Sequence, residues 1–107
     1  MAVTDKPWDG SASRWPDTPS YCDSCLINLN KGDRDKWTQD NCKLPIREPN
    51  GDINVNALGP AAGALNGARG GLKDVPVPAK KEAVRGLMRA YAAAKIDPPP
   101  DLKRMSQ

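Results

Sequence analysis

The only side chains with a conventional reactive spacing in this sequence are those of Cys22-X-X-Cys25, to which the chain adds Cys42. A redox pair needs a thiol of lowered pKa, typically at a helix N-terminus that follows a buried strand. The sequence favours a helix start near Cys22, but no apolar strand precedes it. A redox role therefore ranks last among the roles we consider for these cysteines.

A zinc site is the second possibility for the same three thiols. Structural zinc takes four ligands, and the chain has no histidine, so Asp23 or Asp40 would have to complete the set. Packing of the cysteines as small apolar groups ranks first. An odd number of cysteines also argues against a secreted disulfide framework. We expect no bound cofactor, with zinc at Cys22, Cys25 and Cys42 as the weaker alternative.

Acid–base catalysis is difficult to build from this composition. Without histidine, a base near neutral pH would have to be a raised carboxylate or a lowered lysine in a water-excluding pocket. A domain of 107 residues has little room for such a pocket, and its serines lie mainly in loops without a neighbouring base. We therefore expect a protein that is not an enzyme and has no catalytic residues.

The segment Ala68-Arg69-Gly70-Gly71 is the only candidate phosphate loop. It lacks the Gly-X-X-X-X-Gly-Lys pattern after a strand. Its composition is instead typical of a helix end, with Arg69 placed close to the negative end of the helix dipole.

The N-terminal residues 1–16 are rich in proline, glycine and serine, with Trp8 and Trp15 on either side of a turn. A disordered segment rarely contains two tryptophans so close together, so we expect an irregular arm whose rings cover the core. Thr18 and Pro19 then suit a helix start. The helical spacing of four apolar residues predicts a helix over about 19–28: Tyr21, Cys22, Cys25 and Leu26.

The central stretch, residues 42–71, combines a strand, a turn and a helix. Residues 43–48 form a strand candidate, the turn lies at 49–52, and Ile53 and Val55 alternate with polar residues, which predicts a short β-hairpin. Asn56 is placed to cap a helix from Ala57 to the glycines at 70–71. The expected apolar stripe of that helix is Leu58, Ala61, Ala62 and Leu65. We interpret this stretch as a rigid connector between the two halves.

Residues 79–96 carry the strongest helical pattern in the chain, and Asp97 followed by three prolines ends it. Its expected core face is Ala83, Val84, Leu87, Met88 and Tyr91. The fold class predicted is α+β: a small, mostly helical domain with a short β-hairpin, two C-terminal helices packed together and an irregular N-terminal arm. We divide the chain into an arm (1–16), a compact domain (17–97) and a proline-rich flexible tail (98–107).

Charge is distributed unevenly along the chain, whose net charge is +3. Residues 1–56 have seven basic and nine acidic side chains, whereas residues 57–107 have nine and four. The basic half could meet nucleic acid or an acidic surface. We favour the view that its basic residues form a solvated helix face: Lys80, Lys81, Arg85 and Arg89. No apolar run follows Met1 and none approaches membrane-spanning length, so we expect a cytoplasmic origin and no membrane contact.

Five strings occur in an order that resembles a small domain of tailed bacteriophages and prophages whose activity is unassigned. They are Trp8-Asp-Gly-Ser-Ala-Ser-Arg-Trp15, Cys22-X-X-Cys-Leu-Ile, Cys42-Lys-Leu-Pro-Ile-Arg-Glu-Pro-Asn-Gly51, Asn54-X-Asn-Ala57 and Ala68-Arg-Gly-Gly71. The resemblance runs from about residue 8 to 100. It implies association with virion morphogenesis, in which such domains are sometimes joined to head-maturation proteases. This chain has no room for the protease, so the resemblance carries no catalytic residue over.

The expected function is a non-enzymatic phage structural or assembly protein, most concretely a capsid-associated accessory (cement-like) protein. Its expected location is the virion, and the host cytoplasm during assembly. The expected partner is the major capsid protein, another virion protein or a second copy. The alternative is a small nucleic-acid-binding or regulatory phage protein that uses the basic C-terminal helix, although we consider nucleic acid the less favoured partner. Because tryptophan and arginine dominate interface energetics, the expected partner-binding residues are Trp8, Arg14, Trp15, Arg47 and Arg69.

Overall fold

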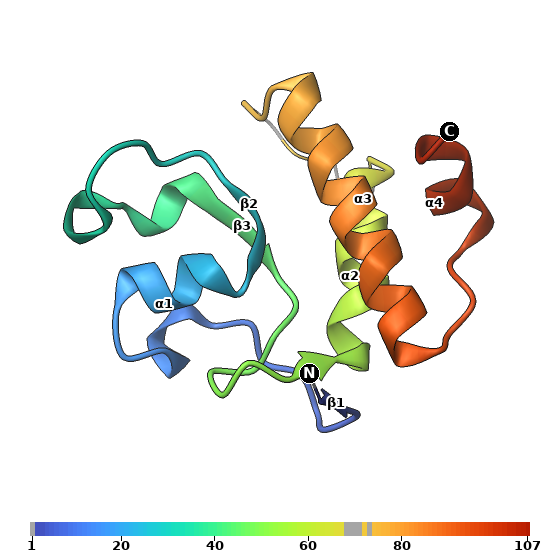
Figure 1. Cartoon of the computed structure of the whole chain (residues 1–107), viewed down its shortest axis with the longest axis horizontal. Helices are drawn as coiled ribbons and strands as arrows, with labels where there is room; N and C mark the ends of the chain where they lie inside the picture. The colour runs from blue at the N-terminus through green and yellow to red at the C-terminus, as the bar shows by residue number, and fades with distance from the viewer. Residues whose placement is uncertain (1, 68–71, 73) are drawn as a thin grey trace.

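Two groups of elements lie side by side in the computed structural model, which describes residues 2–67, 72 and 74–107 (Figure 1). We call the first the ribbon lobe: α1 (Thr18–Asp23), β2 (Cys25–Asn28) and β3 (Cys42–Pro45). We call the second the helical lobe: α2 (Val55–Leu65), α3 (Val77–Ala94) and α4 (Pro100–Met105). Two short strands, β1 (Val3–Thr4) and β4 (Ile53–Asn54), and three single-turn 3-10 helices at Ala12–Arg14, Arg34–Lys36 and Gln39–Asn41 complete the described chain. The predicted α+β class is confirmed.

The ribbon lobe contains an antiparallel strand pair in which Cys25 lies opposite Pro45 and Ile27 opposite Lys43. The helix expected over 19–28 is therefore wrong beyond Asp23. The spacing of the apolar residues around Cys25 and Leu26 suits a helix or a strand equally. Pairing with β3 favours the strand, in which Ile27 is buried and Asn28 is exposed. The expected strand at 43–48 is present as β3, but its partner is β2 rather than residues 53–55.

Residues 49–52 form a closed turn, as expected. The residues on either side of it form a single antiparallel bridge, between Arg47 and Ile53, rather than two long strands. The Glu48 amide donates to the Asp52 carbonyl at 2.7 Å, and Gly51 takes a φ of +97° that favours glycine. β4 then pairs in parallel with β1, with Val3 opposite Ile53. The N-terminal arm is thus attached to the centre of the chain.

α2 begins two residues earlier than the sequence indicated. Its N-cap is Asn54, whose side-chain oxygen accepts the Asn56 amide at 2.8 Å, so Asn56 is not the cap. The helix ends at Leu65 and Gly67 adopts a left-handed conformation, while the expected stop at residues 70–71 lies outside the described residues. Pro60 lies inside the helix.

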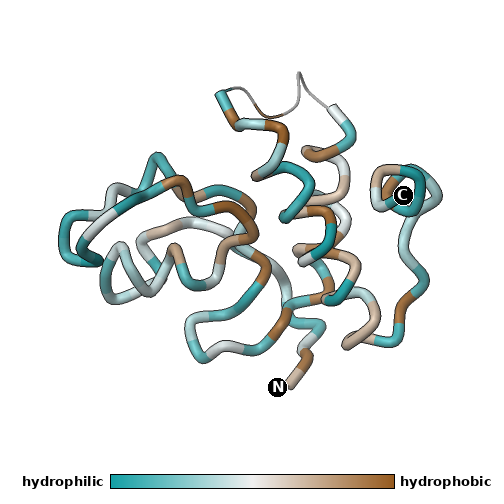
Figure 2. Tube along the Cα trace, turned by 45° about the horizontal axis from the view of Figure 1, so that its top comes forward, coloured by the Kyte–Doolittle hydropathy of each residue, from teal (hydrophilic) through white to brown (hydrophobic). Residues whose placement is uncertain are grey.

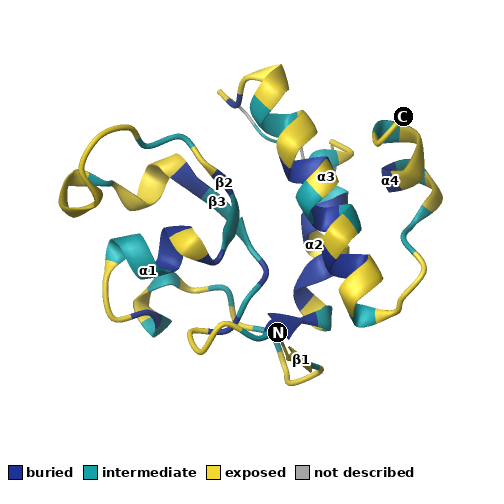
Figure 3. Ribbon diagram, viewed as in Figure 1, coloured by how far each residue is buried: buried dark blue, intermediate teal, exposed yellow. Residues whose placement is uncertain are grey.

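α3 confirms the strongest helical prediction and supplies the centre of the core. Figure 2 shows hydrophobic and hydrophilic residues alternating along it, and Figure 3 shows the buried stretches of α2 and α3. Its buried residues are Ala83, Val84, Leu87, Ala90 and Tyr91, and most of them pack in one cluster with the predicted stripe of α2. The expected packing of the two helices is therefore observed.

The C-terminal segment differs from the flexible tail expected over 98–107. Pro100 starts a helix at a position where proline is favoured, and Leu102 is completely buried in the main core. The Asn66 side-chain amide at the end of α2 donates to the Asp101 carboxylate at 2.8 Å. The buried leucine and this hydrogen bond together dock a segment whose prolines suggested mobility.

Replacement of Leu102 by alanine tests this docking. We expect Leu102→Ala to lower the free energy of unfolding by roughly 2–5 kcal/mol, the usual effect of truncating a buried leucine. Met105→Ala, on the same helix but only partly buried, is the matched control and should cost less. Urea denaturation of both variants is the measurement, and equal small losses would contradict a docked α4.

Candidate protein-interaction site

A disulfide joins Cys22 in α1 to Cys42 at the start of β3, with their Cα atoms 5.3 Å apart. The sequence favours packing of Cys22 and Cys25 as small apolar groups, and that expectation is wrong for Cys22, which is one half of a disulfide. The pairing arises because α1 lies against the ribbon, which brings together cysteines that are 20 residues apart. While bridged, the two sulfurs cannot act as thiolate ligands, and among the described residues no group of three His, Cys, Asp or Glu side chains is placed to hold a metal ion.

The third cysteine, Cys25, is free and only partly buried. Its thiol donates to the Tyr21 carbonyl at 3.3 Å. Burial raises the pKa of the Cys25 thiol to about 12. The thiol is therefore protonated at neutral pH, which is the opposite of the lowered pKa that a nucleophilic or redox cysteine needs.

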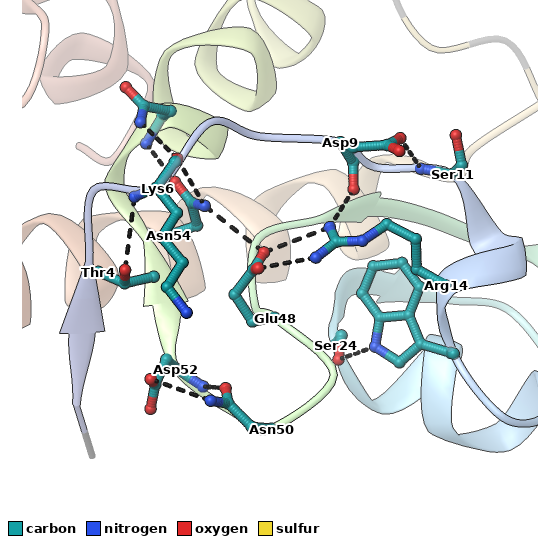
Figure 4. A network of polar contacts seen from close by, with 12 residues as sticks. Thr4, Lys6, Asp9, Ser11, Arg14, Ser24, Glu48, Asn50, Asp52 and Asn54 are labelled. Carbon is teal, nitrogen blue, oxygen red and sulfur yellow. Dashed lines mark hydrogen bonds and ion pairs between the residues drawn. The ribbon is translucent and has the colours of Figure 1, made fainter.

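The N-terminal arm is held by a cluster that we call the arm clamp: Trp8, Arg14, Trp15, Glu48 and Asn54. Arg14 forms a two-pronged pair with Glu48, with Nη2–Oε1 at 2.7 Å and Nη1–Oε2 at 3.3 Å (Figure 4). Its guanidinium carbon also lies 5.8 Å from the ring centroid of Trp8 and 5.6 Å from that of Trp15. Arg14 thus combines a bidentate ion pair with cation–π contacts.

Asn54 connects the arm clamp to α2. Its side chain is fully buried, and its amide donates to the Lys6 carbonyl at 3.1 Å and to Glu48 at 3.5 Å. The oxygen of the same side chain caps α2. Next to it, the side-chain amide of Asn56 donates to the backbone carbonyls of Asp5 and Lys6 at 2.9 and 2.8 Å. The backbone carbonyls of the arm are therefore bound by side chains at the start of α2.

The ionisation of Glu48 follows from these contacts. The hydrogen bonds from Arg14 hold the pKa of the Glu48 carboxyl below its usual value, against the opposing effect of burial. The same bond raises the pKa of Arg14. Both groups are therefore charged at neutral pH, and the pair holds structure rather than transferring protons.

Three of the five expected partner-binding residues, Trp8, Arg14 and Trp15, come together in the arm clamp. Trp15 is only 5% exposed, donates its indole N–H to the Ser24 hydroxyl at 3.0 Å and meets Tyr21 edge-on. Trp15 is therefore a core residue, whereas Trp8 and Arg14 are partly exposed. Arg47 lies elsewhere, and Arg69 lies outside the described residues.

Arg47 lines a groove bordered by the ribbon lobe and α3, which pack against each other at Leu26 and Gly86. The groove has a volume of about 470 Å³, within the range of small-molecule sites. The ribbon lobe contributes Asp23, Ser24, Cys25 and Leu26, the segment around β4 contributes Ile46, Arg47 and Ile53, and α3 contributes Glu82, Gly86, Arg89, Ala90 and Ala93. We call this the inter-lobe groove.

Sequence reasoning missed the residues that organise both features. Glu48 ended the strand predicted at 43–48 and Asn54 belonged to an alternating strand pattern, so neither stood out as a buried polar residue. Arg89 was assigned to a solvated helix face, where it does lie exposed, but it also borders the groove. The sequence did contain one local signal. Asn54 precedes Asn56 by two residues, and either asparagine is of a type that caps a helix.

Within the part of the chain that the structure describes, none of the helices combines the length and apolar character needed to cross a bilayer.

A Glu48→Gln variant tests the arm clamp and its pH dependence. We expect a loss of about 2 kcal/mol in the free energy of unfolding at pH 7, the size of a hydrogen bond to a charged group. Because the pKa of Glu48 is lowered in the folded state, its contribution is present above its ordinary pKa and disappears as the pH falls through the folded value. The difference between variant and parent should therefore shrink as the solution is acidified below the ordinary pKa of a glutamate.

The control for this variant is Glu82→Gln, which breaks an ion pair whose two side chains are more than half exposed. It should change stability much less at pH 7. Equal effects of the two substitutions across the pH range would contradict a structural role for the arm clamp.

Reduction of the disulfide is the second test of this region. Opening a bridge between cysteines 20 residues apart is expected to lower the free energy of unfolding by about 3 kcal/mol. Unfolding in denaturant with and without a phosphine reductant measures the loss. Cys25→Ser should leave the response to reductant intact, whereas Cys42→Ser should abolish it; a parent protein insensitive to reductant would refute the bridge.

Comparison with known proteins supplies no relative for this chain: no protein-family model, no curated protein and no solved structure matches it. The phage context therefore rests on the sequence strings alone. The arm clamp and the inter-lobe groove are the features from which a function has to be argued.

Proposed function

We propose that the protein is a non-enzymatic structural or assembly protein of a tailed-phage particle, most concretely a capsid-associated accessory (cement-like) protein. The observation that carries the binding role is the inter-lobe groove, which is bordered by elements fixed to one another and contains Arg47 and Arg89. The phage setting comes from the resemblance of the sequence strings. The partner in this proposal is the major capsid protein or another virion protein.

The ionisation of the described residues supports a binding role over acid–base chemistry. The large pKa shifts move groups further from neutral pH, because burial raises the pKa of Tyr21 and of Cys25 to about 12. The pKa of Glu48 moves in the other direction, below its usual value. A general base needs a pKa near the working pH, so these shifts favour fixed charges and inert thiols.

The arm clamp supports the same proposal by a different route. It uses Trp15 and the Arg14–Glu48 pair inside the molecule, so the arm holds a defined shape before any partner arrives. Preorganisation of this kind lowers the entropy lost on association. A small accessory protein that binds a repeating lattice would benefit from it.

Nucleic-acid binding through α3 is the second candidate. Lys81, Arg85 and Arg89 are exposed on this helix. Glu82 pairs with Arg85 on the same surface, and Tyr91 is buried and cannot stack on a base. The partial neutralisation and the lack of stacking by Tyr91 rank this candidate below protein binding.

The test is the protein composition of particles purified from the phage or induced prophage that encodes the chain. We expect quantitative mass spectrometry to find the protein at a copy number of the same order as the major capsid protein. Particles assembled without it should lose their contents at a lower temperature than complete ones. Its absence from mature particles would refute the cement role, and its presence in host nucleoprotein instead would favour the second candidate.

A further inference from the structure

The disulfide between Cys22 and Cys42 is in contact with the side chain that closes a neighbouring loop. This loop, residues 29–41 between β2 and β3, we call the bridge loop (Figure 1). We infer that the disulfide is a redox switch for the bridge loop. The closed disulfide holds the loop in its observed form, and reduction releases the loop while the helical lobe stays folded. This inference goes beyond the proposed function and does not depend on it.

Asn30 closes the bridge loop through both atoms of its side-chain amide. Its oxygen accepts the backbone amide of Thr38 at 2.9 Å, and its nitrogen donates to the Thr38 carbonyl at 3.0 Å. The side-chain amide of Asn41 donates to the same oxygen at 3.3 Å. One side chain therefore joins the start of the loop to its end.

The same Asn30 nitrogen lies against the disulfide. It is 3.2 Å from Sγ of Cys42 and 3.8 Å from Sγ of Cys22. Both cysteines are almost fully buried, with Cys22 2% and Cys42 4% exposed. Because Asn30 contacts both sulfurs, a movement that opens the loop also gives a reductant access to the disulfide.

Reduction changes what the two sulfurs need from their surroundings. A bridged sulfur carries no proton, whereas a thiol adds an S–H donor. Two thiols also need more room, because non-bonded heavy atoms stay about 3.5–4.0 Å apart. Near Cys42 the acceptor is Oδ1 of Asn28, at 3.4 Å from Sγ. This oxygen already accepts the backbone amide and the side-chain amide of Asn30, each at 2.9 Å. The Cys42 thiol therefore competes with Asn30 for the acceptor that positions it.

The remaining contacts of the bridge loop are mainly exposed. Its ion pair to α1, between Arg34 and Asp23, joins side chains that are each 55% exposed, and exposed pairs contribute little. Residues 31–41 are exposed apart from Trp37, which packs against the cluster that contains the disulfide. The loop thus has little burial of its own to keep it ordered once Asn30 is displaced.

The rest of the molecule is held by contacts that do not involve the disulfide. In α1, Tyr21 packs against Trp15, whose indole N–H donates to Ser24. β2 is attached to α3 through Ile27, which shares a cluster with Ala83. The main core of the helical lobe contains neither bridged cysteine. We therefore expect reduction to act on the bridge loop and to leave the helices in place.

The two states interconvert by thiol–disulfide exchange with a small dithiol or disulfide. A thiolate of dithiothreitol attacks one sulfur of the pair, the Cys22–Cys42 bond breaks, and the other sulfur leaves as a thiolate that takes up a proton. The second thiol of the reagent then forms its own disulfide and releases the first cysteine, so that two electrons and two protons reach the protein. In the opposite direction, oxidised glutathione accepts the two electrons and leaves as two molecules of glutathione.

The experiment is limited trypsin digestion of the full chain in its oxidised and reduced forms, with cleavage sites identified by mass spectrometry. The bridge loop has three exposed trypsin sites, Lys31, Arg34 and Lys36, and α3 has exposed sites at Lys81 and Arg85. We expect dithiothreitol to raise the initial rate of loop cleavage by at least about tenfold, because cleavage follows the population of the opened form. In the reduced protein the loop should be cut at least about tenfold faster than α3, because only the loop opens locally. The amide chemical shifts of α3 should stay those of the oxidised protein.

Two variants make the test independent of the reagent. The double variant Cys22→Ser with Cys42→Ser should show the fast loop cleavage without any reductant. Asn30→Ala keeps the disulfide but removes the side chain that lies on it, so dithiothreitol should reduce it at least about tenfold faster than the parent, since several hydrogen bonds of the closed loop are lost. Asn50→Ala, an exposed asparagine of the turn at 49–52, is the matched control and should change the reduction rate less than about twofold.

Three results would overturn the inference. The first is loop cleavage at the same rate in the oxidised and reduced forms, or a slow rate in the double serine variant. The second is an equal rise of cleavage in α3 and in the loop, which would show unfolding of the whole chain. The third is reduction of Asn30→Ala at the rate of the parent. All are measured on the purified protein, so they are separate from the composition of particles.

Discussion

The Glu48 carboxylate is the constraint on which the rest of the structure depends. It lies between Arg14 of the arm and Asn54 at the start of α2. Both of these residues also hold other parts of the molecule, since Arg14 contacts the rings of two tryptophans and Asn54 caps a helix. A buried charge is tolerated only when it is paired and hydrogen-bonded. The need to satisfy this one carboxylate therefore fixes the arm, the turn and the first residues of α2 relative to one another.

The chain has few aromatic residues, and its two lobes are packed in different ways. The helical lobe is built on Leu, Ile and Ala packing, whereas the ribbon lobe relies on Trp15, Tyr21 and the disulfide between Cys22 and Cys42. The stretch expected to act as a connector does pass from β3 in one lobe to α2 in the other (Figure 1). The inter-lobe groove lies beside this connection, so its two walls are held by the elements that join the lobes.

Periodic elements were predictable from the sequence, and elements decided by tertiary contacts were not. α3 and the stripe of α2 follow from spacing, because burial of one helix face leaves a pattern along the chain. β2 was predicted as helix because four apolar residues suit either structure until β3 is placed beside them. Leu102 and the disulfide were missed for a related reason, since each depends on a partner distant in sequence. At the site, residue type alone brought Trp8, Arg14 and Trp15 into the prediction, but it could not show that their partner would be Glu48.

The parallel pairing of β1 with β4 has a consequence for how the chain acquires its form. Val3 and Thr4 have their strand partners at Ile53 and Asn54, so the chain must be synthesised as far as Asn54 before these two strands can pair. Non-local pairings of this kind form late, because the loop between the strands has to close first. The pairing of β1 with β4 therefore couples the ordering of Val3 and Thr4 to that of the segment that leads into α2.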